Sequence, residues 1–143
     1  MIICTRRIEF DAGHRLINHE SKCKLLHGHR YAVEASFKSF KTKELDEIGR
    51  VIDFGVIRDI LGQWIDDNFD HNTILNLNDK KLGDEITKIT GQKIYYMNCN
   101  PTAENIANHL LREICPKLFA NHQVECIAIK LYETPNCYVY VER

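Results

Sequence analysis

Alternating apolar and polar positions predict strands at both ends of the chain. From Ile2 to Phe10 one parity is mostly apolar, which is typical of a strand with one half-buried face. The segment His29–Phe37 alternates in the same way, and Val124–Tyr132 and Cys137–Val141 predict two final strands joined by a tight turn. A shorter apolar run, Ile94–Met97, is consistent with one more strand.

Helical spacing predicts two helices between these strands. The first follows Asp53, a candidate N-cap, and carries an apolar stripe that ends near Phe69. The second is expected to begin at Pro101-Thr102, with Glu104 close to its positive N-terminal end. Pro116 is expected to end or kink this second helix. Hairpins separated by helices favour the α+β class with an antiparallel sheet.

Composition narrows the class of protein. The 143 residues suit a single domain, 1–143, and 44% hydrophobic with 27% charged residues predicts an ordinary buried core rather than disorder. A formal net charge of -1 disfavours nucleic acid as a partner, because phosphate binding favours a basic surplus. The apolar runs are far shorter than the roughly 18 residues needed to span a membrane. Six scattered cysteines and no visible signal peptide indicate reduced thiols and a cytoplasmic location.

Seven histidines are many for so short a chain, and His27-Gly28-His29 is the sharpest local pattern. Residues two apart on a strand project from the same face, so both imidazoles can reach one ion. His14 lies just after the first predicted strand, which would pair with the second, and it is the candidate third ligand. Three histidines without a thiolate pair suit a catalytic zinc ion with an open fourth position. The alternative is a set of hydrogen-bonded or exposed strand histidines.

Two further groups are candidates for proton transfer. Cys23 lies four residues before His27, on the loop that would cover a metal there. It is a candidate fourth zinc ligand, a structural thiol or a reactive base activated by a nearby cation. Asp70-His71 closes the first predicted helix, and a carboxylate can orient a histidine for acid–base work. Because sequence neighbours seldom hydrogen-bond through their side chains, a polar helix terminus is the alternative.

Two carboxylates are candidates for substrate binding. Counting by twos back from Glu133 gives the apolar residues Leu131, Ile129 and Ile127, so Glu133 lies either at the solvent edge or in a pocket. In a pocket it would suit a guanine-like ring, because a carboxylate accepts two parallel N–H bonds from such a ring. Glu104 lies in the first turn of the second predicted helix.

These elements together resemble the 6-pyruvoyltetrahydropterin synthase family over nearly the whole chain. The motifs that carry the resemblance occur in the family's order: Phe10-Asp11-Ala12-Gly13-His14, Cys23 with His27-Gly28-His29, Val51-Ile52-Asp53-Phe54, Asp70-His71, Pro101-Thr102-Ala103-Glu104-Asn105 and Glu133-Thr134-Pro135. Within the family, C-x-x-x-H-G-H is similar to the 6-carboxytetrahydropterin synthases of the queuosine (7-deazaguanine) pathway. The pyruvoyl-forming synthases have a longer gap, and the folate-pathway variant has a glutamate where this chain has Lys24.

The resemblance implies the tunnelling fold (T-fold), a four-stranded antiparallel sheet with two helices on one face. It also implies assembly into a homo-oligomeric ring, usually a hexamer, with active sites between subunits. The implied substrate is a pterin triphosphate, 7,8-dihydroneopterin triphosphate, and the implied products are 6-carboxytetrahydropterin, acetaldehyde and triphosphate. The alternatives are 6-pyruvoyltetrahydropterin synthase activity on the same substrate and a non-enzymatic module with a closed Cys-His₃ zinc site.

Site roles are carried over from the resemblance as well. Zn²⁺ would be held by His14, His27 and His29. Cys23 would abstract a proton, and His71, oriented by Asp70 and donated by a neighbouring chain, would be the second acid–base group. Glu133 would anchor the amino-pyrimidine edge of the pterin, with Thr102 and Glu104 assisting.

Two features depart from the family's pattern or lie outside it. The stretch 78–98 is longer than in the shortest bacterial relatives and has no assigned role. The triphosphate site is not identifiable, and Arg15 and Lys24 are candidates only because they lie close to the motifs.

Overall fold

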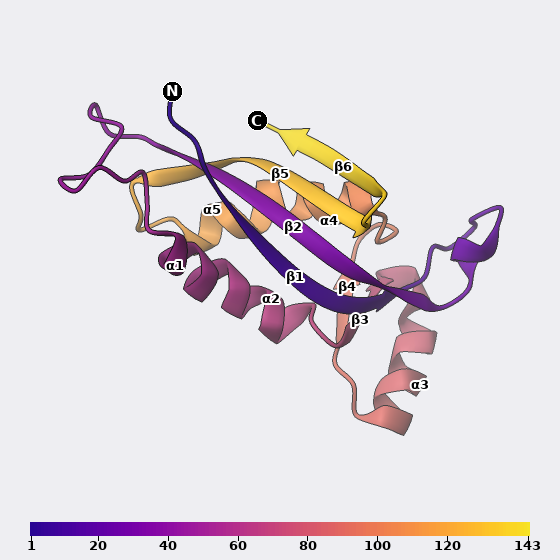
Figure 1. Ribbon diagram of the computed structural model, residues 1–143. Helices are drawn as coiled ribbons and strands as arrows, with labels where there is room; N and C mark the ends of the chain where they lie inside the picture. Colours follow the sequence, from indigo (N-terminus) through magenta and orange to yellow (C-terminus); the bar gives the residue numbers. More distant parts are fainter.

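Six strands form one sheet in the computed structural model, which describes residues 1–143 (Figure 1). The strand order is β4-β3-β1-β2-β5-β6. The bounds are β1 Cys4–His14, β2 His27–Ser39, β3 Asn72–Asn76, β4 Ile94–Met97, β5 Val124–Thr134 and β6 Cys137–Glu142. The four long strands pair antiparallel, whereas β3 runs parallel to both β1 and β4. The α+β class is confirmed, but the expected four-stranded antiparallel sheet gains two short parallel strands at one edge.

The first two strands are longer than their apolar patterns predict. β1 continues to His14 and β2 begins at His27, and these two residues face each other in the register of the pair. The prediction that His14 follows the strand was therefore wrong. Along β1 the side chains that face the core remain apolar through Ala12. Asp11 and Gly13 lie on the opposite face, so the pattern of apolar residues gives no sign that the strand continues.

Each predicted helix is present and is interrupted by a π-helical turn. The first consists of α1 Phe54–Ile57, η2 Arg58–Gly62 and α2 Gln63–Asn68, and the second of α4 Ala103–His109, η4 Leu110–Ile114 and α5 Cys115–Leu118. The Asp53 carboxylate caps α1 by accepting a hydrogen bond of 2.7 Å from the Gly55 N–H, as expected. Pro116 does not end the second helix, which continues to Leu118. The wide turn η4 lies directly before α5, and such a turn lets the helix continue past a residue that has no amide N–H to donate.

A third helix occupies the segment that the sequence left unassigned. A short 3₁₀ turn, η3 Leu77–Asp79, leads into α3 Lys80–Thr90, which ends at Gly91 with a left-handed φ of 74°. Gly83 packs against the hydroxyl group of Tyr96, where a Cβ atom would clash. In Figure 1 α3 lies at one end of the molecule, beside β3 and β4 and apart from the other helices.

One hydrophobic core lies between the sheet and the helices of the two interrupted segments. It comprises 24 buried residues, among them Phe10 of β1, Phe37 of β2, Leu61 of η2 and Leu110 of η4. In β5 the register shifts twice, once opposite Ser36 and Phe37 of β2 and once between Tyr132 and Thr134 against β6. These β-bulges change which residues face the core.

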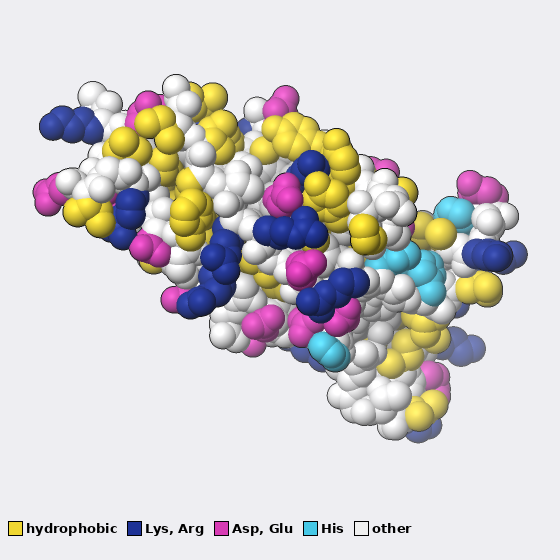
Figure 2. Space-filling view, in the orientation of Figure 1, with side chains coloured by type: hydrophobic (Ala, Val, Ile, Leu, Met, Phe, Trp, Pro, Cys, Tyr) yellow, Lys and Arg dark blue, Asp and Glu magenta, His cyan; other side chains and the backbone are white.

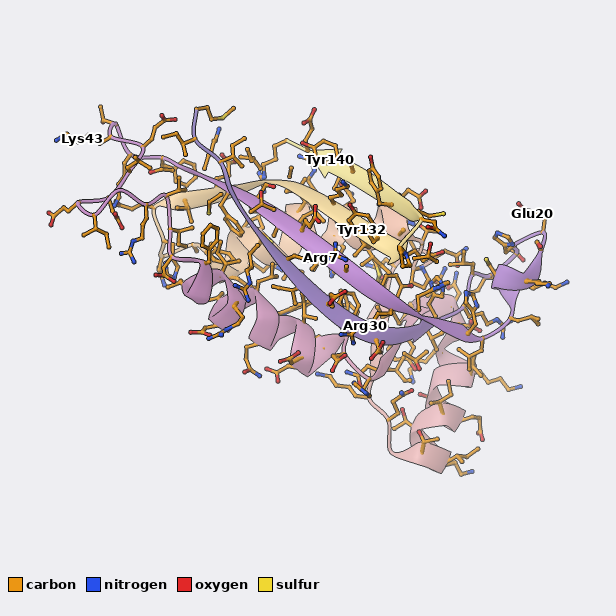
Figure 3. All side chains as sticks on the ribbon, viewed as in Figure 1. Arg7, Glu20, Arg30, Lys43, Tyr132 and Tyr140 are labelled. Atoms are coloured by element: carbon orange, nitrogen blue, oxygen red, sulfur yellow. The ribbon has the colours of Figure 1, made fainter.

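The other face of the sheet carries charged and aromatic side chains. Figure 3 shows Arg7, Arg30 and Tyr132 on this face, and the Arg7 guanidinium lies 5.0 Å from the centre of the Tyr132 ring. In Figure 2 basic, acidic and apolar side chains alternate across it, and histidine side chains gather toward the end of the molecule that carries α3. We call the helix-covered face the inner face and this one the outer face.

None of the helices has the length and apolar character that crossing a membrane requires.

Candidate active site and metal centre

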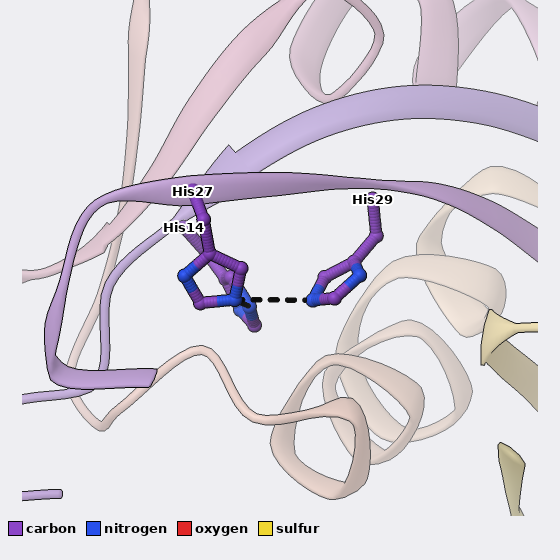
Figure 4. A group of neighbouring side chains, drawn as sticks. All are labelled: His14, His27 and His29. Carbon is purple, nitrogen blue, oxygen red and sulfur yellow. Dashed lines mark hydrogen bonds between the residues drawn. The ribbon is translucent and has the colours of Figure 1, made fainter. Parts of the chain in front are cut away.

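Three histidine side chains converge on the inner face, at the end of the β1–β2 pair (Figure 4). His14 projects from β1, and His27 and His29 project from β2. The Nε2 atom of His27 lies 3.0 Å from Nε2 of His14 and 3.1 Å from Nε2 of His29. The structure thus brings together the three predicted metal ligands, whose nitrogen atoms all lie within 4.8 Å of one another.

The hydrogen bonds behind these rings fit a bound cation. Nδ1 of His14 lies 2.8 Å from the carbonyl oxygen of Pro101, and Nδ1 of His27 lies 2.7 Å from that of Leu25. A carbonyl only accepts, so each Nδ1 carries the proton and each Nε2 presents a lone pair. Two lone pairs 3.0 Å apart repel unless a cation lies between them. Together with His29 these two imidazoles make a three-histidine donor set that zinc prefers, with a fourth position left for substrate.

Burial favours the metal-binding form of two of the three imidazoles, those of His14 and His29. His14 has no exposed surface, and its burial lowers the pKa of its imidazole. Burial also lowers the pKa of His29, although the nearby negative charge of Glu133 opposes the shift. Neutral imidazole is the ligand form, so a cation can bind at neutral pH without first displacing a proton.

Glu133 reaches the cluster because of the second bulge in β5. The strand register shifts between Tyr132 and Thr134, which leaves Glu133 without a partner on β6. Its Oε1 atom lies 3.5 Å from Nε2 of His29, and the side chain is 28% exposed. The prediction left a solvent edge or a pocket open, and the structure places this carboxylate in a pocket.

The apolar row that was counted back from Glu133 needs one correction. Ile129 and Leu131 are fully buried as expected, but Ile127 is only half-buried. The first bulge of β5 removes Ile127 from the row, and Cys126 takes the place opposite Phe37. Counting by twos fails wherever a strand contains a bulge.

A cavity of about 390 Å³ adjoins Glu133. It brings together Cys23, Thr102, Glu104 and Glu133, which are four of the predicted catalytic and substrate-binding residues. Cys23 enters from the turn η1 Lys22–Lys24, and Thr102 and Glu104 enter from the start of α4. Cys23 lies outside the group of metal-ligating atoms, so the geometry does not favour it as a fourth ligand.

Asp70 and His71 form a hydrogen-bonded pair that the spacing argument disfavoured. His71 Nδ1 lies 2.8 Å from Asp70 Oδ2, because His71 adopts a left-handed backbone with φ of 56° that turns its ring toward the preceding side chain. The Asp70 carboxylate raises the pKa of His71 by hydrogen bonding and by its charge. Burial would raise the pKa of Asp70, but the bonds from the Asp11 N–H and from His71 lower it.

This pair does not join the metal cluster of its own chain. Asp70 and His71 precede β3 and are bonded to Asp11, whose side chain points to the outer face. His71 lines a hollow of about 440 Å³, which His29 also borders, but the His71 side chain is 78% exposed and is not among the clustered metal-ligating atoms of His14, His27 and His29. The histidine cluster lies on the inner face, so one chain presents the two groups on opposite faces of the sheet.

One residue beside the metal cluster escaped prediction from the sequence. Tyr31 is fully buried, and its hydroxyl lies 3.1 Å from Nδ1 of His14; its position two residues after His29 was the available signal. Burial, and then the charge of Glu133, raise the pKa of Tyr31.

The two candidates for the triphosphate lie apart from the metal cluster. Arg15 lies with its Nε atom 3.4 Å from Asp79 Oδ2, and Lys24 is exposed beside Cys23.

Known proteins match the chain over its full length. The sequence matches the family described as 6-pyruvoyl tetrahydropterin synthase over residues 3–143. Proteins named 6-carboxy-5,6,7,8-tetrahydropterin synthase from Rickettsia conorii and Rickettsia felis are each 59% identical over 141 residues, covering 99% of this chain and 100% of theirs. The crystal structure of an uncharacterized protein from Wolinella succinogenes shares the fold, with a TM-score of 0.75 and 22% identity over 100% of this chain and 99% of that one. The chain belongs to the 6-pyruvoyl tetrahydropterin synthase family.

Proposed function

We propose that the chain is a zinc-dependent lyase that forms 6-carboxy-5,6,7,8-tetrahydropterin from 7,8-dihydroneopterin triphosphate, with release of acetaldehyde and triphosphate. The reaction would serve queuosine and 7-deazaguanine synthesis. The observation that carries the proposal is the cluster of three imidazoles beside Glu133, whose carboxylate lines one cavity together with the Cys23 thiol. The names of the full-length Rickettsia relatives support the carboxy product.

The metal and the cavity would divide the work between them. Zn²⁺ bound by His14, His27 and His29 would polarise the hydroxyl oxygens of the substrate side chain and acidify the neighbouring C–H and O–H groups. Cys23, which lines the cavity with Glu133, would accept the proton that is removed.

The pterin ring would be oriented by polar side chains that line the cavity. The Glu133 carboxylate would accept two N–H bonds from the amino-pyrimidine edge, since it is held by the bulge and points inward. Thr102 and Glu104, at the start of α4, line the same cavity and would assist at the ring. These contacts would fix the substrate side chain between the thiol and the metal ligands.

A second copy of the chain would complete the site. His71 lies on the outer face, so its proposed acid–base role requires that a neighbouring chain present this histidine to the cavity. This supports a homo-oligomer with sites between subunits, and we propose the hexameric ring of the family. The hydrogen-bonded pair of Asp70 and His71, which we call the dyad, would then return a proton to the intermediate, with Asp70 holding the imidazole in place.

The deciding experiment identifies the product. Purified protein is incubated with 7,8-dihydroneopterin triphosphate, the products are identified by mass, and zinc is measured on the same sample. We expect 6-carboxytetrahydropterin and acetaldehyde together with stoichiometric zinc. Formation of the 6-pyruvoyl product alone would overturn the assignment in favour of pyruvoyl synthase activity. Turnover that is independent of metal would overturn the role of zinc.

A non-enzymatic zinc module is the second candidate, and the geometry gives it less support. A closed Cys-His₃ site needs the sulfur of Cys23 among the ligand atoms, but Cys23 lies outside that group and faces the cavity.

A further inference from the structure

The backbone of His71 is held in an unusual conformation from both sides. Its φ of 56° lies in the left-handed region, which a non-glycine residue keeps only when its surroundings impose it. On one side the His71 N–H donates to the carbonyl oxygen of Asp11 at 2.7 Å. On the other side the His71 carbonyl accepts a hydrogen bond of 2.9 Å from Nε2 of Gln92. The two bonds fix the peptide groups that flank the residue.

Gln92 belongs to the segment that had no assigned role, between the end of α3 and the start of β4. The hydroxyl of Thr73, a residue only 5% exposed, donates to its Oε1 atom at 2.6 Å. Since the His71 carbonyl can only accept, the amide of Gln92 has a single orientation that satisfies both partners. The backbone carbonyl of Gln92 is itself bonded by the Thr87 hydroxyl of α3 at 2.9 Å.

The imidazole of His71 depends on this backbone for its direction. Its side chain is 78% exposed, and the hydrogen bond from Nδ1 to Asp70 is the contact that orients the ring. Moreover, the pairing of adjacent side chains is itself a result of the left-handed φ. A change in the backbone at residue 71 would therefore turn the ring away from Asp70 even if both side chains were intact.

We propose that Gln92, oriented by Thr73 and placed directly after α3, is a positioning residue that holds the His71 imidazole against Asp70. The inference rests on the proposed function for its catalytic consequence, since His71 is the acid–base group there. It also gives the long segment between β3 and β4 a role, because α3 returns the chain to the point where one side-chain amide can bond the residue that precedes β3.

A purely structural role for Gln92 predicts something different. If the amide only joined the loop before β4 to the start of β3, its loss would lower stability and leave the electrostatic environment of His71 unchanged. The charged groups that face His71 are Asp70, Asp11 and Arg30, and none of them is altered when Gln92 is replaced. The pKa of His71 therefore reports the distance between its ring and Asp70.

The experiment titrates His71 by NMR in ¹³C-histidine-labelled full-length protein, with the signal assigned through His71→Gln. Gln92→Met removes the donor at nearly constant volume, and Thr73→Val removes the hydroxyl that orients it. Thr73→Ser retains that hydroxyl and serves as the rescue variant. The control is Gln63→Met, which deletes the amide of an exposed glutamine that is bonded to Asp67 at 2.9 Å on α2.

We expect the pKa of His71 to fall toward its ordinary value in Gln92→Met and Thr73→Val, because the ring moves away from the Asp70 carboxylate that raises it. It should stay unchanged in Thr73→Ser and Gln63→Met. An unchanged His71 pKa in a folded Gln92→Met or Thr73→Val protein would overturn the proposal.

Turnover supplies the second readout. If the proposed reaction is correct, kcat should fall roughly tenfold in Gln92→Met and Thr73→Val with little change in KM, because ring orientation and not substrate binding is disturbed. A wild-type protein without activity would contradict the proposed function. The titration would still decide the role of Gln92, because it requires neither substrate nor turnover.

Discussion

Single backbone carbonyls decide the chemistry of the histidine cluster. The carbonyls of Pro101 and Leu25 place the protons of His14 and His27 on Nδ1 and leave both Nε2 atoms free to bind a cation. The H-x-H spacing predicted that the rings would meet, because a strand places alternate residues on one face. It could not predict the tautomers, since Pro101 lies 87 residues from His14 along the chain.

Replacement of Cys23 tests the separation of proton transfer from metal binding. We expect Cys23→Ala to retain zinc and its thermal unfolding midpoint, because the sulfur lies outside the ligand group. Its kcat should fall by about 10²- to 10⁴-fold, the usual contribution of a general base. Zinc content and kcat are measured on one preparation, with Cys4→Ala as the control cysteine at the start of β1. Loss of zinc from Cys23→Ala would instead indicate a fourth ligand.

Replacement of Asp70 tests the electrostatics of the dyad. The Asp70 carboxylate raises the pKa of His71, so Asp70→Asn should lower that pKa toward the ordinary value. The protonated form of His71 would then be lost at a lower pH, and any limb of the kcat/KM profile that requires it should move to lower pH. NMR titration and the pH profile measure the two effects. An identical His71 titration in Asp70→Asn would rule out the coupling.

Among the elements, the regular ones could be predicted and the irregular ones could not. The period-two and helical patterns located the four long strands and both interrupted helices, because each has one face against the core. The two bulges of β5 have no such signature, so the place of Ile127 was wrong and the pocket position of Glu133 stayed open. Strand β3 was missed because only its three central residues are buried and asparagines bound it at both ends, and helix α3 was missed because most of its residues are exposed.

The first turn of α4 gives a test at the scale of an element. The Thr102 hydroxyl caps the helix by accepting a bond of 3.2 Å from the Asn105 N–H. Thr102→Ala should lower the free energy of unfolding by about 1 kcal/mol, whereas Thr102→Ser, which keeps the hydroxyl, should lower it much less. Urea denaturation measures both values. Equal losses in the two variants would show that the methyl group, and not the cap, carries the effect.

At the scale of the whole molecule, the sheet separates the parts of the site. The inner face carries the histidine cluster and the cavity, and the outer face carries Asp70 and His71. The motifs located both groups along the sequence but could not place them in space, because the face of a residue that follows a helix depends on how that helix packs.

Mixed oligomers provide the test of a shared site. Cys23→Ala and His71→Gln should each be nearly inactive alone. When the two variants are co-expressed, about a quarter of the sites in a mixed ring would join an intact Cys23 to an intact His71 from another chain, and activity should return to that level. The control pairs Cys23→Ala with the double variant, which can form no intact site. Absence of recovery in proven mixed oligomers would mean that one chain supplies both residues.

The left-handed backbone of His71 has a consequence for protein engineering. A design procedure that optimises stability alone would select position 71 for change, because asparagine and glycine adopt this conformation with less strain than histidine. We expect His71→Asn to raise the midpoint of thermal unfolding in calorimetry while turnover is lost; a lower midpoint would contradict this. A thermostable version of this enzyme should therefore keep histidine at position 71 and gain its stability at sites remote from the dyad.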